Sequence, residues 1–435
     1  MIDIPQITFP SYKLASYLLT PLIPFYLKKR IKKDKEDKTR LSERYGHASQ
    51  ERPTGKLIWL HAASVGELIS TLSLLDKINT ENPDITLLVT SGTVTSAEIA
   101  KNKLPKNVIH QFAPLDSPVF VNRFLNYWKP DLVLWLESEF WPNHLREIKS
   151  RQIPAILLNA RMSEKSFKRW SEHPKSIQTL LSCFTTLSAQ SSKDRDKLVK
   201  LAKDREVLLP GNMKLAAQPL SYDQIEYKSL KKIIGKRKII VAASTHPTEE
   251  QRLLDCYKSY ASTIEQKPLL IIVPRHPQRG AEVFDIITNS KLKAACRSKN
   301  EDIEVSTDIY LADTLGELGL FYALSDIVIM GGSFSGKIGG HNPIEPALLD
   351  TAIIVGPDMS NFASITKAML EDKAIKQVKN DEDLTKTISK LLVKSNRASS
   401  LKENAKKWAG SRSKSILKRV KNMVLTHLSD HKEAV

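Results

Sequence analysis

The sequence is poor in cysteine, and its three cysteines stand far apart in the chain. Cys183, Cys256 and Cys296 form no CxxC motif and are odd in number, so we expect reduced thiols rather than a disulfide framework. The 16 glycines and 22 prolines are scattered rather than clustered, which excludes a low-complexity chain. With 41% hydrophobic residues over 435 positions, the composition predicts a globular protein of two domains.

Acidic residues are too few to balance the basic ones: 48 Asp and Glu stand against 66 Lys and Arg, for a net charge of +18. Such an excess predicts an anionic partner, which composition leaves open among nucleic acid, an anionic membrane surface and a phosphorylated substrate. Residues 382–430 form a basic tail that we expect to be helical and solvated. Aromatic residues do not interleave its charges, so nucleic acid is not the expected partner.

The N-terminal segment lacks an uninterrupted apolar run long enough to predict a membrane span. Residues 7–27 are apolar and aromatic but contain one lysine and three prolines. They carry no small-residue cleavage site, so we do not expect a removed signal peptide. A lysine-rich stretch, KKRIKKDKEDK, follows directly. This pairing is typical of a helix at an anionic leaflet, and we expect residues 1–36 to associate with a membrane. A soluble helix packed on its own domain is the alternative.

Strand and helix patterns alternate over most of the chain. Continuous apolar runs predict strands buried on both faces of a parallel sheet, with helical spacing between them. The pattern predicts an α/β protein with doubly wound domains at 37–214 and 237–435, a linker at 215–236, and a ligand cleft between the domains. The expected strands are Leu57–Ser64, Ile85–Ser91, Val108–Ala113, Leu132–Glu137, Ala155–Asn159, Phe184–Ala189, Val207–Pro210, Ile239–Ala243, Leu269–Val273, Ile327–Met330 and Ile353–Val355.

The stretch LIWLHAASVGEL at residues 57–68 joins the first strand to a helix through small residues. Glu67 then lies in the first turn of the helix, at the edge where doubly wound sheets bind ligands. The same residues predict a capping box, in which the Ser64 hydroxyl accepts from the Glu67 amide and the carboxylate returns to the Ser64 amide. Taken alone, the stretch favours a cap over a catalytic role.

Three loops after strands of the second domain carry residues suited to a nucleotide. Glycines in GGSFSGKIGGHNPIEP (331–346) admit close approach of the backbone, and Glu345 suits the vicinal hydroxyls of a ribose. The motif is neither GxGxxG nor GxxxxGK[ST], so neither a dinucleotide fold nor a P-loop is predicted. Arg275 in the loop VPRHP suits a phosphate. The third loop is DTLGEL (313–318), and Asp313 is expected to cap the helix that begins there.

Other polar residues follow the strands without forming a metal site. Glu137 and Glu139 end the strand LVLWL. Lys214 in GNMK is either simply solvated, as such lysines usually are, or balances the charge of an acidic group. His246 is followed by two glutamates, but the spacing is not HExxH and no second histidine is suitably placed, so no zinc site is expected. We expect Ser244 or Thr245 to cap the next helix instead.

Nine motifs occur in order from about Arg40 to Asn361. They are HAASVGE, FAPLDSP with NRFL, ESEFWPN, NARMS, GNMK, STHPTEE, VPRHPQR, DTLGELGLFY and GGHNPIEPA. Together they resemble the 3-deoxy-D-manno-octulosonic acid (Kdo) transferases of lipopolysaccharide biosynthesis, glycosyltransferase family 30. The resemblance implies a GT-B fold of two Rossmann-like domains. The first would bind the acceptor, the lipid A precursor lipid IVA, and the second the donor CMP-Kdo. It also implies a location on the cytoplasmic side of the inner membrane.

The resemblance assigns roles to single residues. Glu67 matches the general base, and Glu137 and Lys214 match residues that stabilise the transition state of an inverting single displacement. It implies no metal and no cofactor besides the donor substrate. The alternatives are another GT-B enzyme that uses a uridine nucleotide-sugar, and a non-enzymatic basic protein that binds membranes or nucleic acid. The residues that match the CMP site are Pro274, Arg275, Leu315, Gly316, Glu317, Asn342, Pro343, Ile344 and Glu345.

Overall fold

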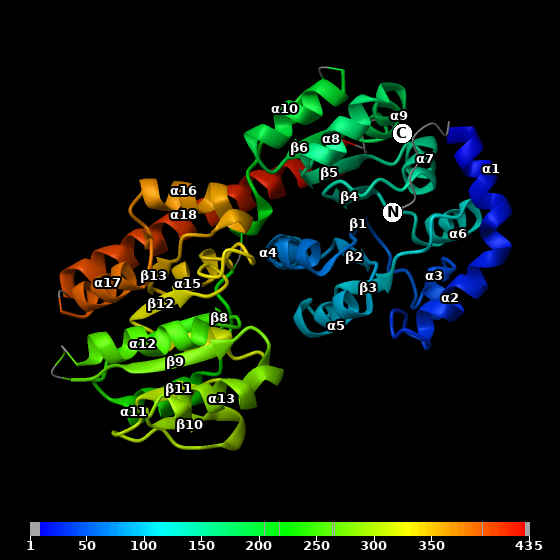
Figure 1. The fold of residues 1–435 in the computed structure, drawn as a ribbon. Helices are drawn as coiled ribbons and strands as arrows, with labels where there is room; N and C mark the ends of the chain where they lie inside the picture. The colour runs from blue at the N-terminus through cyan, green and yellow to red at the C-terminus, as the bar shows by residue number, and fades with distance from the viewer. Residues whose placement is uncertain are drawn as a thin grey trace. The chain divides into compact units, whose positions relative to one another are not determined.

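The computed structural model describes residues 9–203, 205–216, 218–262, 264, 266–393 and 395–430. Within these ranges the chain forms two compact units, each built around a parallel sheet (Figure 1). The first unit runs to residue 216 and takes up the chain again at Lys414, and the second extends from Gln218 to Ser413. The predicted α/β class with two doubly wound domains is confirmed.

The first unit has seven parallel strands in the order β3-β2-β1-β4-β5-β6-β7. The strand order therefore reverses at β1, which lies between β2 and β4. Its strands are β1 (Leu57–Ala62), β2 (Thr86–Ser91), β3 (Ile109–Phe112), β4 (Leu132–Leu136), β5 (Ala155–Ala160), β6 (Thr186–Ala189) and β7 (Val207–Leu208). Its helices are α1 (Phe9–Leu19), η1 (Thr20–Leu22), α2 (Ile23–Ile31), α3 (Leu41–Arg44), α4 (Val65–Glu81), α5 (Val94–Lys103), α6 (Pro118–Trp128), α7 (Pro142–Ser150), α8 (Glu164–Ser171), α9 (Pro174–Leu181), α10 (Ser192–Leu201) and η2 (Met213–Ala216).

Strand β1 shows why the continuous apolar runs form inner strands. Leu57 and Trp59 lie in one core cluster, while Ile58 and Leu60 lie in another. All four side chains are fully buried, and the strand pairs with β2 on one side and β4 on the other. Because successive side chains point to opposite faces of a sheet and both faces are buried here, the run from Leu57 to Leu60 is apolar at every position.

The second unit repeats this architecture in the order β10-β11-β9-β8-β12-β13-β14. Its strands are β8 (Ile239–Thr245), β9 (Leu269–Pro274), β10 (Ala294–Cys296), β11 (Ile309–Leu311), β12 (Ile327–Met330), β13 (Ala352–Val355) and β14 (Lys376–Gln377). Its helices are α11 (Gln224–Ile234), α12 (Glu249–Ala261), η3 (Pro277–Arg279), α13 (Gly280–Asn289), η4 (Arg297–Lys299), α14 (Leu318–Leu324), α15 (Ile344–Ala347), η5 (Ser360–Phe362), α16 (Ala363–Glu371) and α17 (Asp381–Val393), followed by α18 (Ser395–Asp430).

The domain boundaries differ from the predicted ones at both ends of the second unit. The expected linker at 215–236 contains helix α11, which buries Leu230 and Ile234. The predicted domain at 237–435 ends too late, because the last part of α18 belongs to the first unit. The residues of α18 that share a core cluster with Ile58 are Ile416, Val420, Val424 and Leu428.

Helices α1 and α2 lie along one side of the first unit (Figure 1). Leu27 is fully buried, but most of the large apolar side chains of this segment face outward. Within the described ranges, no helix combines the length and apolar character needed to cross a membrane. The exposed apolar residues, which we call the N-terminal apolar patch, are Leu14, Tyr17, Leu18, Leu19, Leu22, Phe25 and Tyr26.

Candidate active site

Glu67 lies in the first turn of α4, directly after β1, and is only 5% exposed. Its Oε2 accepts the N–H of Ala63 at 2.8 Å, and its Oε1 accepts the hydroxyl of Ser64, also at 2.8 Å. Ser64 is the N-cap, and its hydroxyl oxygen lies 3.4 Å from the Glu67 amide. The capping box is therefore present, but the carboxylate returns to the amide of Ala63 and not to that of Ser64.

The environment of Glu67 is nevertheless not that of an ordinary cap. Burial raises its pKa to about 7, against the two hydrogen bonds that favour the ionised form. The charges of Glu137 and Glu139, which follow strand β4, raise the pKa further. A carboxyl group with a pKa near neutrality exchanges protons most effectively at the pH of a cell. One side chain thus stabilises the helix start and has a pKa near neutrality.

The structure brings Glu137 and Lys214 to loops near the same edge of the first sheet. Glu137 follows β4, the strand next to β1, and has a φ of 53°, a left-handed conformation that few non-glycine residues adopt. Lys214 lies in η2, which contacts helix α4. The amide of Met213, beside it, donates to Asn159 Oδ1 at 2.9 Å, which ties η2 to the end of β5.

The predicted nucleotide-binding residues of the second unit follow three strands of one sheet. Pro274 ends β9, and Arg275 after it is exposed. The segment from Leu315 to Glu317 follows β11, and the segment from Asn342 to Glu345 follows β12. Strands β11, β9, β8 and β12 are consecutive neighbours, and helices α14 and α15 contact each other. The structure therefore brings these residues together along one sheet edge, as predicted.

The side chains in these segments differ in their availability to a ligand. The carboxylate of Glu317 accepts from Arg297 at 2.6 and 3.2 Å and from the hydroxyl of Thr314. Burial raises the pKa of Glu317, but these hydrogen bonds outweigh it and the pKa lies below its ordinary value. The amide of Asn342 donates to Glu345 at 3.2 Å. The carboxylate of Glu317 therefore holds its own loop through Arg297 and Thr314. Leu315, two residues earlier, is exposed and presents an apolar side chain.

Glu249 is an organising residue that the sequence interpretation missed. Its side chain is 1% exposed, and its two oxygens accept the backbone N–H groups of His246, Gly332 and Phe334 at 3.0, 2.8 and 3.0 Å. One carboxylate therefore joins the end of β8 to the glycine-rich loop after β12. Gly331 allows this approach, because a Cβ there would overlap the backbone of Ser244. In the sequence, Glu249 stands out only as one of the two glutamates of the motif STHPTEE.

Two predicted caps are wrong. Helix α12 begins after Thr248, while Thr245 donates its hydroxyl to Glu250, so neither Ser244 nor Thr245 caps the helix. Asp313 does not cap α14, which begins at Leu318. It accepts the amide and hydroxyl of Ser298 at 3.0 and 2.7 Å and so holds the loop after β10. No cluster of metal-ligating side chains occurs among the residues that the structure describes.

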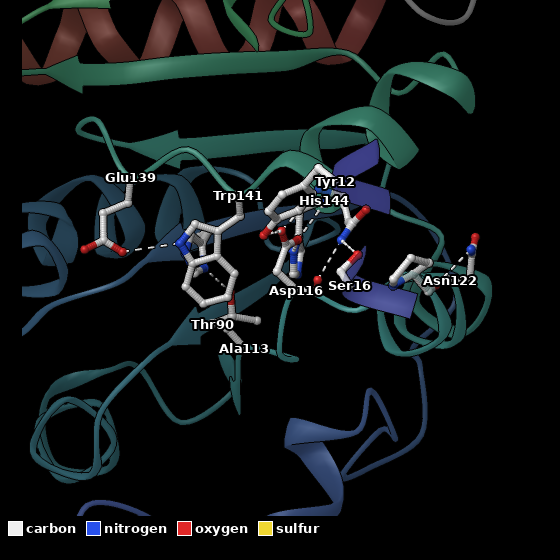
Figure 2. Close-up of polar contacts among 12 residues, drawn as sticks. Tyr12, Ser16, Thr90, Ala113, Asp116, Asn122, Glu139, Trp141 and His144 are labelled. Carbon is white, nitrogen blue, oxygen red and sulfur yellow. Dashed lines mark hydrogen bonds and ion pairs between the residues drawn. The ribbon is translucent and has the colours of Figure 1, made fainter. Parts of the chain in front are cut away.

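Asp116 fastens helix α1 to the edge of the first sheet. Its Oδ2 accepts the hydroxyl of Tyr12 at 2.9 Å, and its Oδ1 accepts from His144 Nδ1 at 2.7 Å (Figure 2). Asn143 donates to Ser16 of the same helix at 2.9 Å and to the backbone carbonyl of Asp116. The polar face of α1 is thus bound to the loop that follows β3 and to the first turn of α7, while its apolar face remains exposed. The motif FAPLDSP contained Asp116, but no role was predicted for it.

Comparison with known proteins places this chain in a family. Residues 39–217 match the 3-deoxy-D-manno-octulosonic-acid transferase (kdotransferase) family. A 3-deoxy-D-manno-octulosonic acid transferase of Rickettsia bellii is 38% identical over 381 residues, 88% of this chain and 90% of the relative. The protein of the same name from Haemophilus influenzae is 33% identical over 88% of this chain and 90% of its own. The chain belongs to the Kdo transferase family.

Membership of the Kdo transferase family makes the chain a glycosyltransferase, which confirms that part of the sequence interpretation. A solved structure of UDP-GlcNAc 2-epimerase from Neisseria meningitidis superposes with a TM-score of 0.54 at 13% identity. The match covers 84% of this chain and all of the epimerase. At that identity the likeness shows the fold alone, and it agrees with the predicted GT-B architecture.

Proposed function

We propose that this Kdo transferase moves Kdo from CMP-Kdo to lipid IVA, the lipid A precursor, on the cytoplasmic side of the inner membrane. The environment of Glu67 is the observation that carries the mechanism. A buried carboxyl group with a pKa near 7, at the carboxyl edge of the first sheet, suits a general base for an acceptor hydroxyl.

In the proposed reaction, ionised Glu67 accepts the proton of the acceptor hydroxyl as its oxygen attacks the anomeric carbon of Kdo. The new carbon–oxygen bond forms while the bond to the CMP phosphate breaks, so the reaction is a single displacement with inversion. CMP leaves as a stable phosphate and needs no protein acid. Positive charge develops at the sugar in an oxocarbenium-like transition state. Glu137 is suited to stabilise that charge, and Lys214 to balance the carboxylate of Kdo.

The donor side of the proposal rests on the second unit. The residues proposed to bind the CMP moiety are those from Pro274 to Arg275, from Leu315 to Glu317 and from Asn342 to Glu345. Arg275 is exposed at the end of β9, where a guanidinium would pair with the phosphate. The loops beside it supply backbone N–H groups to the charge that develops on the leaving group. No metal or further cofactor is part of the proposal.

Membrane association is proposed for the N-terminal apolar patch. Leu18 and Phe25 are 67% and 69% exposed, and lysines follow the patch in the chain. An apolar face next to lysines suits the surface of an anionic leaflet, where the proposed lipid acceptor would lie. Because Asp116 holds the polar face of α1, the patch would keep the first sheet's edge at the membrane surface.

Replacing Leu18 and Phe25 with serine is expected to weaken binding to vesicles of anionic phospholipid. Each substitution removes apolar area that the free protein already exposes, so the fold should be kept. Co-sedimentation with vesicles measures the effect. Val305, 94% exposed in the second unit, supplies the control, because Val305→Ser should leave binding unchanged. Unaltered binding of the patch variant would contradict the role of the patch.

The pH dependence of the reaction is expected to report Glu67. Since a base must be ionised, kcat/KM should fall about tenfold per pH unit below about pH 7 and level off above it. The measurement is kcat/KM from pH 5.5 to 8.5, with acceptor binding followed separately at each pH. A profile that stays level down to pH 5.5 would show that a group with a pKa near 7 is not required.

The choice of nucleotide tests the proposed donor against the uridine nucleotide-sugar alternative. CMP should raise the melting temperature of the protein, because a ligand that binds only the folded state stabilises it. UDP and UMP should have little effect at equal concentration. Stabilisation by UDP without stabilisation by CMP would favour the alternative, and no response to any nucleotide would contradict the proposed CMP site.

A further inference from the structure

Two histidines from different loops of the second unit form a pair. His246 follows β8, and His341 lies in the glycine-rich loop after β12. Their Nε2 atoms are 2.8 Å apart, and the ring planes differ by only 6°. A hydrogen bond between two ring nitrogens needs one N–H and one lone pair, so one ring donates and the other accepts. The donating ring keeps a lone pair at its Nδ1.

Further basic side chains surround this pair. Arg275 and His276 follow the neighbouring strand β9, and both are exposed. The ring of His276 lies 6.0 Å from that of His246. The charge of Arg275 acts on both rings of the pair. Four basic groups from three loops therefore gather at the carboxyl edge of the second sheet, where an anion would be bound.

The acidic groups that face His246 come from helix α12, and both have other partners. Glu249 accepts three backbone N–H groups, as described above. Glu250 accepts the hydroxyl of Thr245 at 2.9 Å and the guanidinium of Arg279 at 2.8 Å. Both carboxylates favour a charged His246, but burial outweighs them and lowers its pKa.

The pair is therefore neutral near pH 7. Burial lowers the pKa of His341 to about 4, and the charges of His246, Arg275 and His276 act in the same direction. A phosphate beside Arg275 would offset these positive charges and favour a protonated ring. The added proton would go to the Nδ1 of the donating ring, so the bond between the two Nε2 atoms would remain.

We propose that binding of a nucleoside monophosphate at this edge is coupled to the uptake of one proton by the His246–His341 pair. The proposal rests on the proposed function for the choice of nucleotide. It makes the pair part of the phosphate site next to Arg275. The edge gains a positive charge when the phosphate is present, while the glycine-rich loop stays bound to the end of β8.

Titration calorimetry of the full chain with CMP at pH 7.5 tests the coupling. The binding enthalpy, measured in buffers of different ionisation enthalpy, gives the number of protons taken up per CMP. We expect net uptake of up to one proton for CMP and none for cytidine, which has no phosphate. In the double variant His246→Gln/His341→Gln, CMP should bind more weakly and without uptake, while cytidine should bind as before, which shows that the site is folded.

A matched control separates the pair from its neighbour. His276→Gln removes a histidine from the same edge but not from the hydrogen-bonded pair, so uptake should persist. CMP binding without uptake, uptake that persists in the double variant, or uptake lost only in His276→Gln would each overturn the proposal. Titration with UMP distinguishes failure of the proton coupling from failure of the proposed function. Binding of UMP alone with uptake would reject the CMP donor and keep the coupling, whereas binding of neither nucleotide would reject both.

Discussion

Replacing Glu67 with glutamine is expected to lower the rate of Kdo transfer by about 10²- to 10⁴-fold while the protein remains folded. Glutamine cannot accept the proton of the acceptor hydroxyl. It keeps the shape of glutamate, so its oxygen can still accept the N–H of Ala63 and its amide can donate to the Ser64 hydroxyl. The measurement is the initial rate of transfer by the wild type and the variant at equal concentrations of folded protein.

The stability of the same variant separates a base from a simple cap. Because the pKa of Glu67 is raised from 4.5 to about 7, its ionised form disfavours the folded state. This penalty is absent below about pH 4.5, grows between pH 4.5 and 7, and reaches about 3 kcal/mol above pH 7. Glu67→Gln should therefore be at least as stable as the wild type at pH 8, and its relative gain should vanish near pH 4.

Two outcomes would contradict this account of Glu67. Normal transfer by the variant would remove its role as the base. A loss of stability at pH 8 would show that the carboxylate matters for the helix start instead. Ser64→Ala is the companion variant, since it removes the cap hydroxyl and keeps the carboxyl group. It should cost about 1 kcal/mol of stability, with a far smaller effect on transfer.

Glu249→Ala is expected to destabilise the second unit by about 3–6 kcal/mol. The substitution leaves the buried N–H groups of His246, Gly332 and Phe334 without their acceptor, and each unsatisfied group costs about 1–2 kcal/mol. The glycine-rich loop would lose its attachment to the end of β8. Hydrogen exchange should accelerate at residues 331–347 before other parts of the unit, and CMP should no longer raise the melting temperature.

Glu382→Ala is the control for this prediction. Glu382 is an exposed glutamate near the start of α17 that pairs with Lys386 at the surface, so removing it changes the net charge equally and leaves no buried group without its partner. Its effect on stability should be within about 0.5 kcal/mol. Glu249→Gln keeps one acceptor oxygen and should fall between the two. Equal stability of the Glu249 and Glu382 variants would contradict the organising role of Glu249.

The sequence predicts the inner strands well because burial on both faces requires continuous apolar runs. Strand β12 has the predicted bounds, Ile327–Met330. Three other strands were missed: β10 and β11 have three residues each, and β14 has two exposed ones, Lys376 and Gln377. Runs this short carry no periodicity. Helix α18 was predicted as helical, but its spacing could not show that its last turns pack in the core of the first unit.

In the candidate site too, the sequence predicts features that depend on consecutive residues and misses those that depend on residues far apart in the chain. Sequence could predict that Glu67 starts a helix after a strand, because strand, small residues and helix are consecutive. Its raised pKa depends on burial and on Glu137 and Glu139, which lie far from it in the chain. Asp313 likewise accepts from Ser298, and Glu249 accepts from Gly332 and Phe334, which lie in other loops. Local patterns alone therefore predicted helix caps at Ser244 or Thr245 and at Asp313, where the structure instead has hydrogen bonds that join loops.

The most direct test of the central claim is mass spectrometry of the lipid products formed by the full chain from CMP-Kdo and lipid IVA. The account predicts lipid IVA with added Kdo and release of CMP, and almost none of this product from Glu67→Gln. Unmodified lipid IVA in the presence of folded protein that binds CMP would contradict it. So would equal product from the wild type and Glu67→Gln.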